Sequence, residues 1–65
     1  MADDDMLTPA EVADYLRVEL TTLMDWRYRR RGPKSIKLGK ARSAPVRYYR
    51  RDVEAWIQEQ TEASA

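Results

Sequence analysis

Cysteine and histidine are both absent from this chain of 65 residues. Neither a disulfide framework nor a zinc site built from thiolates and imidazoles can therefore support the fold. The usual pairs of nucleophile and general base are missing with them, and the carboxylates lie mainly in polar segments, so we expect no enzymatic activity and no cofactor. No apolar run approaches the roughly 20 residues that span a bilayer. The sequence predicts a soluble, cytoplasmic protein that does not contact a membrane.

Acidic residues are absent from residues 27–51, and this absence is more informative. Of the twelve Lys and Arg residues in the chain, all but Arg17 lie in that stretch, although the net charge is only +1. We call residues 27–51 the basic segment. Its separation from the acidic ends favours binding of a polyanion, and the alternative is a solvated face that those ends balance.

Residues 8–11, Thr-Pro-Ala-Glu, form a capping-box pattern with proline at the first helical position. Apolar residues follow at spacings of three and four, so we expect an amphipathic helix that ends near Arg17. Only residues 17–19 separate it from the next apolar pattern. Such a short break is typical of a helix-turn-helix corner, with Val18 filling the corner.

A second helix is predicted from Leu20 to about Arg30, stopped by the Gly32-Pro33 pair. Leu23 and Trp26 face the first helix, flanked by Leu20 and Met24. The other face carries short hydroxyl groups near its start and arginines near its end, which suits insertion into a DNA major groove. The residues on that outer face are Thr21, Thr22, Asp25, Tyr28 and Arg29.

Residues 35–38 and 46–49 alternate between polar and apolar and predict an antiparallel hairpin with its tip at 39–45. A last helix is expected over 51–60. The residues expected to pack the hairpin on the helices are Ile36, Leu38, Val46 and one of the tyrosines Tyr48 and Tyr49. Trp26 and Trp56 are expected to anchor the core. At this length we expect one domain over 7–60, with flexible segments at 1–6 and 61–65.

Several motifs recur together between Leu7 and about Gln58. They are Leu7–Ala13, Leu16–Val18, Trp26–Arg27, Gly32–Pro33, Ile36–Gly39, Arg47–Tyr48 and Arg51–Ile57. With them the chain resembles the excisionase and AlpA-like family of small DNA-binding proteins, which are related to the DNA-binding domain of MerR regulators. The resemblance implies a mainly α, winged helix-turn-helix fold with a small β-hairpin, a second helix in the major groove, and a wing over an adjacent minor groove or the backbone.

Two features depart from the family pattern. Arg30 stands where the family often has a glycine, which predicts a helix end without its left-handed cap. The wing is longer than the common form by residues 41–45, which predicts more contact with DNA.

Candidate DNA contacts divide by role. Thr21 and Thr22 are candidates for base reading, as is Asp25, unless Asp25 instead pairs with Arg29 four residues on. Arg42 is a candidate for a narrow minor groove, the alternative being a mobile loop charge. The full set of predicted DNA-binding residues is Thr21, Thr22, Asp25, Arg27, Tyr28, Arg29, Arg30, Arg31, Lys40, Arg42 and Ser43.

The resemblance leaves three functions open. The first is a phage excisionase in a bacterial host cell, which binds and bends attachment-site DNA, associates with itself cooperatively and directs the phage integrase toward excision. The second is a stand-alone, AlpA-like transcription regulator. The third, from another class, is a basic protein-interaction module, which would explain the basic segment but not the helix-turn-helix spacing or the wing.

Overall fold

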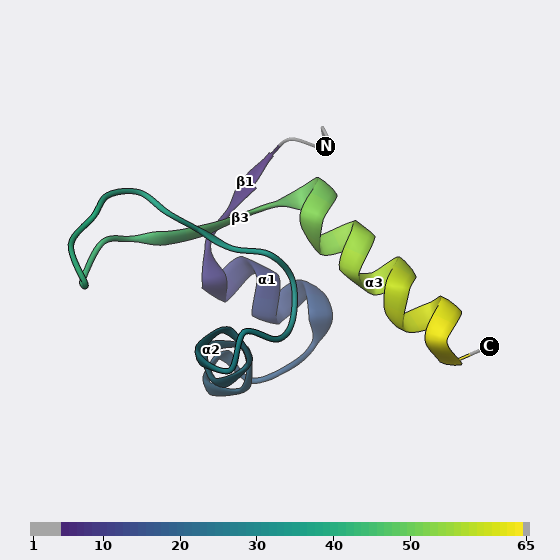
Figure 1. The fold of residues 1–65 in the computed structure, drawn as a ribbon. Helices are drawn as coiled ribbons and strands as arrows, with labels where there is room; N and C mark the ends of the chain where they lie inside the picture. The colour runs from purple at the N-terminus through teal and green to yellow at the C-terminus, as the bar shows by residue number, and fades with distance from the viewer. Residues whose placement is uncertain (1–4, 65) are drawn as a thin grey trace.

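The structure is a computed structural model, and it describes residues 5–64. It is a winged helix-turn-helix with three helices and a small antiparallel sheet, as the sequence predicts (Figure 1). Its elements in chain order are β1 (Met6–Leu7), α1 (Pro9–Leu16), α2 (Leu20–Tyr28), β2 (Ile36–Lys37), β3 (Val46–Tyr49) and α3 (Arg50–Ser64).

The capping box at the start of α1 is confirmed. The Glu11 backbone N–H donates to Thr8 Oγ1 over 3.1 Å, and the Thr8 backbone N–H donates to Glu11 Oε1 over 2.8 Å. Hydrogen bonding of the Glu11 carboxylate, first to the Thr8 backbone and then to the Thr8 side chain, lowers the pKa of this carboxyl. The helix therefore begins at a fixed point, because its first free N–H groups already have partners.

A left-handed residue, Arg17, ends α1, with φ at 58°. Its backbone N–H donates to the Asp14 carbonyl over 3.1 Å, and the Val18 N–H donates to the Ala13 carbonyl over 3.0 Å. These two bonds make up a Schellman motif, which closes a helix and turns the chain sharply. The motif produces the predicted corner between α1 and α2.

The end of α2 corrects the sequence-based expectation in two ways. The helix stops at Tyr28, two residues before the predicted end at Arg30. The left-handed cap is also present, because Arg30 itself adopts it with φ at 59°. The Arg30 N–H donates to the Arg27 carbonyl over 3.1 Å, and the Arg31 N–H donates to the Trp26 carbonyl over 2.6 Å, which is again a Schellman pair.

The sheet has a strand that the sequence did not predict. Its order is β1-β3-β2, with Leu7 opposite Tyr48 and Ile36 opposite Arg47. The Asp5 carbonyl also accepts the Arg50 backbone N–H over 2.9 Å. Ordered structure therefore begins before the boundary expected at residue 7, while Asp3 and Asp4 lie outside the described residues.

The C-terminal helix also exceeds its predicted range. α3 begins at Arg50 and runs to Ser64, whereas 51–60 was expected. The predicted flexible segment 61–65 is thus helical as far as it is described, and Ala65 lies outside the described residues. The Thr61 hydroxyl donates to the Ile57 carbonyl over 3.0 Å, which ties this last turn to the helix before it.

The core forms where the three helices meet strands β1 and β3. Tyr48 is the hairpin tyrosine that packs on the helices, and burial raises the pKa of its hydroxyl. The expectation for Leu38 was wrong: this side chain is 47% exposed because it follows β2 toward the wing, beyond the reach of the helices. The buried residues are Leu7, Val12, Ala13, Leu23, Tyr48 and Val53.

The two tryptophans pack on each other between α2 and α3. Their ring centroids lie 5.3 Å apart with the planes inclined at 42°. Trp26 also packs against the buried core, while Trp56 is half-buried outside it. Trp56 therefore anchors α3 through Trp26, which differs from the fully packed role that the sequence predicted.

Candidate nucleic-acid interface

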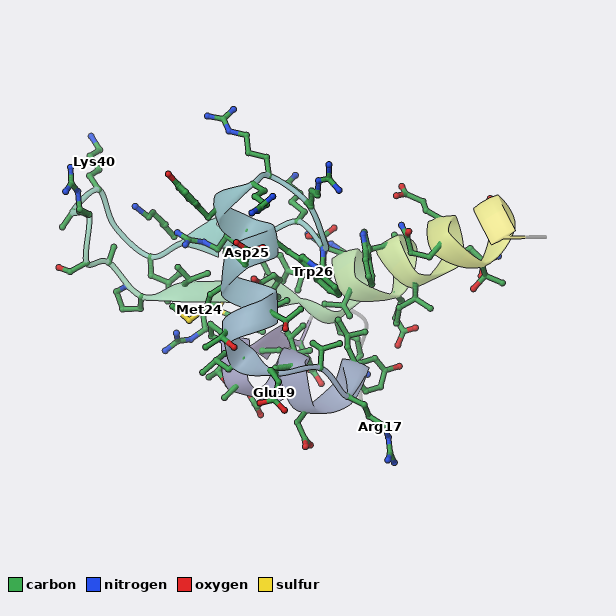
Figure 2. The ribbon with its side chains drawn as sticks, turned by 90° about the horizontal axis from the view of Figure 1, so that it is seen from below. Arg17, Glu19, Met24, Asp25, Trp26 and Lys40 are labelled. Carbon is green, nitrogen blue, oxygen red and sulfur yellow. The ribbon has the colours of Figure 1, made fainter. Side chains whose placement is uncertain are left out.

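The outer face of α2 is open to solvent. Thr21, Asp25 and Arg29 are exposed, and Tyr28 is 80% exposed, while Thr22 is half-buried at the edge of this face. Figure 2 shows α2 crossing the front of the molecule, with no other element over it. The structure therefore leaves the helix that the sequence proposed for base reading accessible along its length.

Asp25 and Arg29 form the intrahelical pair that the sequence offered as one alternative. Arg29 Nε lies 3.1 Å from Asp25 Oδ2 and 3.2 Å from Asp25 Oδ1. Both side chains are more than half exposed, so the pair contributes only about 0.3–0.5 kcal/mol. Breaking it on contact with DNA costs little, and Asp25 holds Arg29 against the helix until then.

A basic groove follows the C-terminal end of α2. Its volume is about 210 Å³. The chain turns at Arg30, so residues before and after this turn both line the groove. Lys34, which is not among the DNA-binding residues that the sequence predicts, joins the predicted arginines here. The residues that line the groove are Arg27, Arg30, Arg31, Gly32, Pro33, Lys34 and Ser35. Four cations around one small concavity suit the phosphates of a DNA backbone, each of which a guanidinium group can grip through two oxygens.

Gly32 is required for this groove. Its φ is +77°, and a Cβ at this position would lie 3.1 Å from Trp26 Cε3. A side chain here would therefore have to adopt a disfavoured conformation and also push on the tryptophan pair. The glycine brings the basic turn close against the end of α2.

The wing carries the remaining predicted contacts. The loop between β2 and β3 extends away from the helices (Figure 1), and Figure 2 shows Lys40 near its end. The Ala44 N–H donates to the Ala41 carbonyl over 3.0 Å, so Arg42 and Ser43 occupy the middle of a tight turn. Lys40, Arg42 and Ser43 are all exposed. This turn places Arg42 in the exposed loop of the wing.

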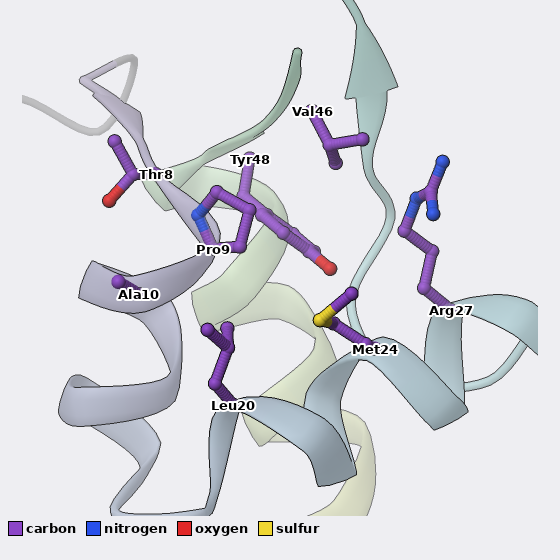
Figure 3. A pocket seen from close by; sticks show the side chains of 8 residues that line it. All are labelled: Thr8, Pro9, Ala10, Leu20, Met24, Arg27, Val46 and Tyr48. Atoms are coloured by element: carbon purple, nitrogen blue, oxygen red, sulfur yellow. The ribbon is translucent and has the colours of Figure 1, made fainter. Parts of the chain in front are cut away.

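An apolar groove lies on the other flank of α2 (Figure 3). Its volume is about 310 Å³. Leu20 and Met24 are 41% and 54% exposed because they line this groove; the sequence had placed them toward α1. The lining residues are Thr8, Pro9, Ala10, Leu20, Met24, Arg27, Val46 and Tyr48.

Among residues 5–64, no group of three or more His, Cys, Asp or Glu side chains is placed to hold a metal ion. In the same part of the chain, no helix is both long enough and apolar enough to cross a membrane.

Comparison with known proteins identifies the family. A family model described as a helix-turn-helix domain matches residues 6–61. The match covers most of the chain, which therefore belongs to this helix-turn-helix family. No curated protein and no solved structure matches the chain. Membership of the family, together with the exposed α2 and the basic groove at its end, indicates that the protein binds DNA.

Proposed function

We propose that this protein is an excisionase that binds and bends attachment-site DNA and directs a phage integrase toward excision. The observation that carries the proposal is the arrangement of α2, the basic groove and the wing. Each presents donors to solvent, and together they can engage a major groove, its flanking phosphates and the next minor groove.

Roles follow from position. Thr21 and Thr22, near the start of α2, would contact base edges, and the groove around Arg30 would bind phosphate. Arg42, at the turn of the wing, would enter the minor groove. Gripping two neighbouring grooves from one rigid body favours bent DNA, because the bend brings both grooves within reach.

Self-association is part of the proposal. A single module of this size buries roughly 600–1,000 Å² of its own surface on DNA, so useful affinity requires adjacent copies or contact with the integrase. The exposed acids Glu59 and Glu62 on α3 would meet the basic segment of the next copy. Reversing both charges should abolish cooperative binding to tandem sites while single-site affinity is retained, and unchanged cooperativity would exclude this contact.

The decisive experiment has two stages. Wild-type protein first selects duplexes from a random pool, and binding to the selected sequence is then measured with and without an integrase from the same genome. Integrase-enhanced occupancy and a shift of recombination toward excision would support the excisionase. Selective binding without either effect would instead support a transcription regulator. Failure to select any duplex would instead support the third function, a basic protein-interaction module.

A further inference from the structure

Arg17 is the one basic residue outside the basic segment, and it is not among the DNA-binding residues that the sequence predicts. It is exposed and occupies the left-handed position at the corner between α1 and α2. Figure 2 shows its side chain at the end of α1, extending away from the body of the protein. The corner thus presents a cation at the end of α2 opposite the basic groove.

Local charge balance does not account for this side chain. Asp14 and Glu19 are its acidic neighbours in sequence. The ion pairs found among residues 5–64 join Arg29 to Asp25 and Arg50 to Glu54, and neither involves Arg17. The guanidinium therefore keeps its donors available for a ligand.

The backbone conformation points the same way. Glycine adopts a φ of 58° without steric cost, whereas a residue with a Cβ does not. The only other non-glycine residue with positive φ among the described residues is Arg30, which lines the basic groove. Unfavourable backbone conformations cluster where a side chain has a function. The two strained arginines stand just before and just after α2.

The length of α2 allows both arginines to reach DNA. Nine residues at 1.5 Å each span about 14 Å. A helix of that length lying in the major groove, which is roughly 12 Å wide, passes phosphates near both of its ends, so cations just beyond those ends can meet the DNA backbone at two places. We propose that Arg17 binds a backbone phosphate beside the N-terminal end of α2, opposite the phosphates that the basic groove holds.

This inference rests on the proposed DNA-binding function. It predicts that one substitution raises the stability of the protein and weakens its binding to DNA. Arg17→Gly relieves the backbone and removes the cation, so its melting temperature should rise by about 4 °C. Its Kd for the selected duplex should rise about tenfold, as expected for loss of one charged hydrogen bond. The slope of log K against log salt should become less steep by about 0.9.

Three further variants control the experiment. Arg17→Lys keeps the charge and should keep the salt slope. Arg17→Asn tolerates the left-handed conformation and should reproduce the binding loss, whether or not Arg17→Gly proves stable. Gln58→Glu changes the net charge by the same amount on the exposed side of α3 and should leave the slope unchanged.

The possible results distinguish the role of Arg17 from DNA binding itself. A more stable Arg17→Gly protein with wild-type affinity and slope would overturn the role of Arg17 and leave DNA binding intact. A similar loss in Gln58→Glu would also overturn it, because net charge would then explain the effect. A wild-type protein that selects no duplex would overturn the role of Arg17 together with the proposed function.

Discussion

At the scale of single residues, Arg30 combines two demands that conflict. Its side chain lines the basic groove, and its backbone takes a conformation that costs a residue with a Cβ roughly 1–2 kcal/mol. The Schellman hydrogen bonds from Arg30 and Arg31 hold the turn in place despite that cost. Position 30 therefore exchanges some stability for a cation at the end of α2.

The first prediction concerns this exchange. Arg30→Gly should raise the free energy of unfolding by about 0.5–1 kcal/mol, because glycine accepts a positive φ. It should also weaken DNA binding through loss of one groove cation. Urea unfolding and fluorescence anisotropy with a labelled duplex measure the two effects. A variant that is less stable than the wild type would contradict the assignment of strain at this turn.

The second prediction concerns the capping box. Hydrogen bonds lower the pKa of Glu11 in the folded protein, so its contribution to stability is full above the reference pKa of 4.5. That contribution is lost as the pH falls through 4.5 and below, where the carboxylate is protonated. Glu11→Gln should therefore show a weaker decline of melting temperature in acid than the wild type does. Parallel curves for the two proteins would show that Glu11 is not responsible.

Local chemistry explains which residue-level expectations succeeded. The Thr8 and Glu11 box and the Asp25 and Arg29 pair involve neighbours three and four positions apart, so the sequence contains all that they need. The conformation of Arg30 depends instead on how the chain must turn after α2 to reach the hairpin. Arginine by itself disfavours a left-handed backbone, so the residue type at position 30 does not predict this conformation.

At the scale of elements, β1 shows the limits of pattern reading. Two residues are too few to display an alternation, so Met6 and Leu7 carried no strand signal. The strand exists because β3 offers its free edge and Leu7 fills the core. The helices and the hairpin were predictable because each repeats its pattern over several residues. The early end of α2 was not predictable. The Gly32-Pro33 pair sets only the last point that the helix could reach, and the helix stops before it, at Tyr28.

The third prediction tests β1. Leu7 is 6% exposed, so Leu7→Ala should lower the free energy of unfolding by about 2–5 kcal/mol. Met6 is 45% exposed in the same strand and provides the matched control, since Met6→Ala should cost far less. Circular dichroism during urea titration measures both. Equal effects from the two variants would indicate that burial of Leu7 does not hold the strand in place.

At the scale of the whole molecule, the basic surface sets how binding responds to salt. Four cations line the groove beyond α2, and Arg42 adds one from the wing. Each phosphate that is neutralised contributes about −0.9 to the slope of log K against log salt. The candidate site is thus spread over α2, the turn after it and the wing. The sequence identified most of its members, but neither their grouping around one groove nor Lys34.

The fourth prediction follows from this count. The four groove cations and Arg42 give a slope near −4.5, the Arg17 contact proposed above brings it to about −5.4, and Arg42→Ala should make it less steep by about 0.9. Arg42→Lys should keep the wild-type slope while losing any preference for a narrow minor groove, because lysine is a compact, strongly hydrated charge. Titrations at several salt concentrations measure the slopes. A slope near zero for the wild type would exclude DNA as the ligand of this surface.

The contact between Trp26 and Trp56 also makes the protein its own optical probe. These are the only two tryptophans in the chain, and their rings lie 5.3 Å apart across α2 and α3. At that separation the two indoles share their excited states, so near-ultraviolet dichroism and emission report the spacing of the two helices directly. Because α2 is the helix proposed to enter the groove, any shift of it against α3 on binding can be followed in unlabelled protein, in real time.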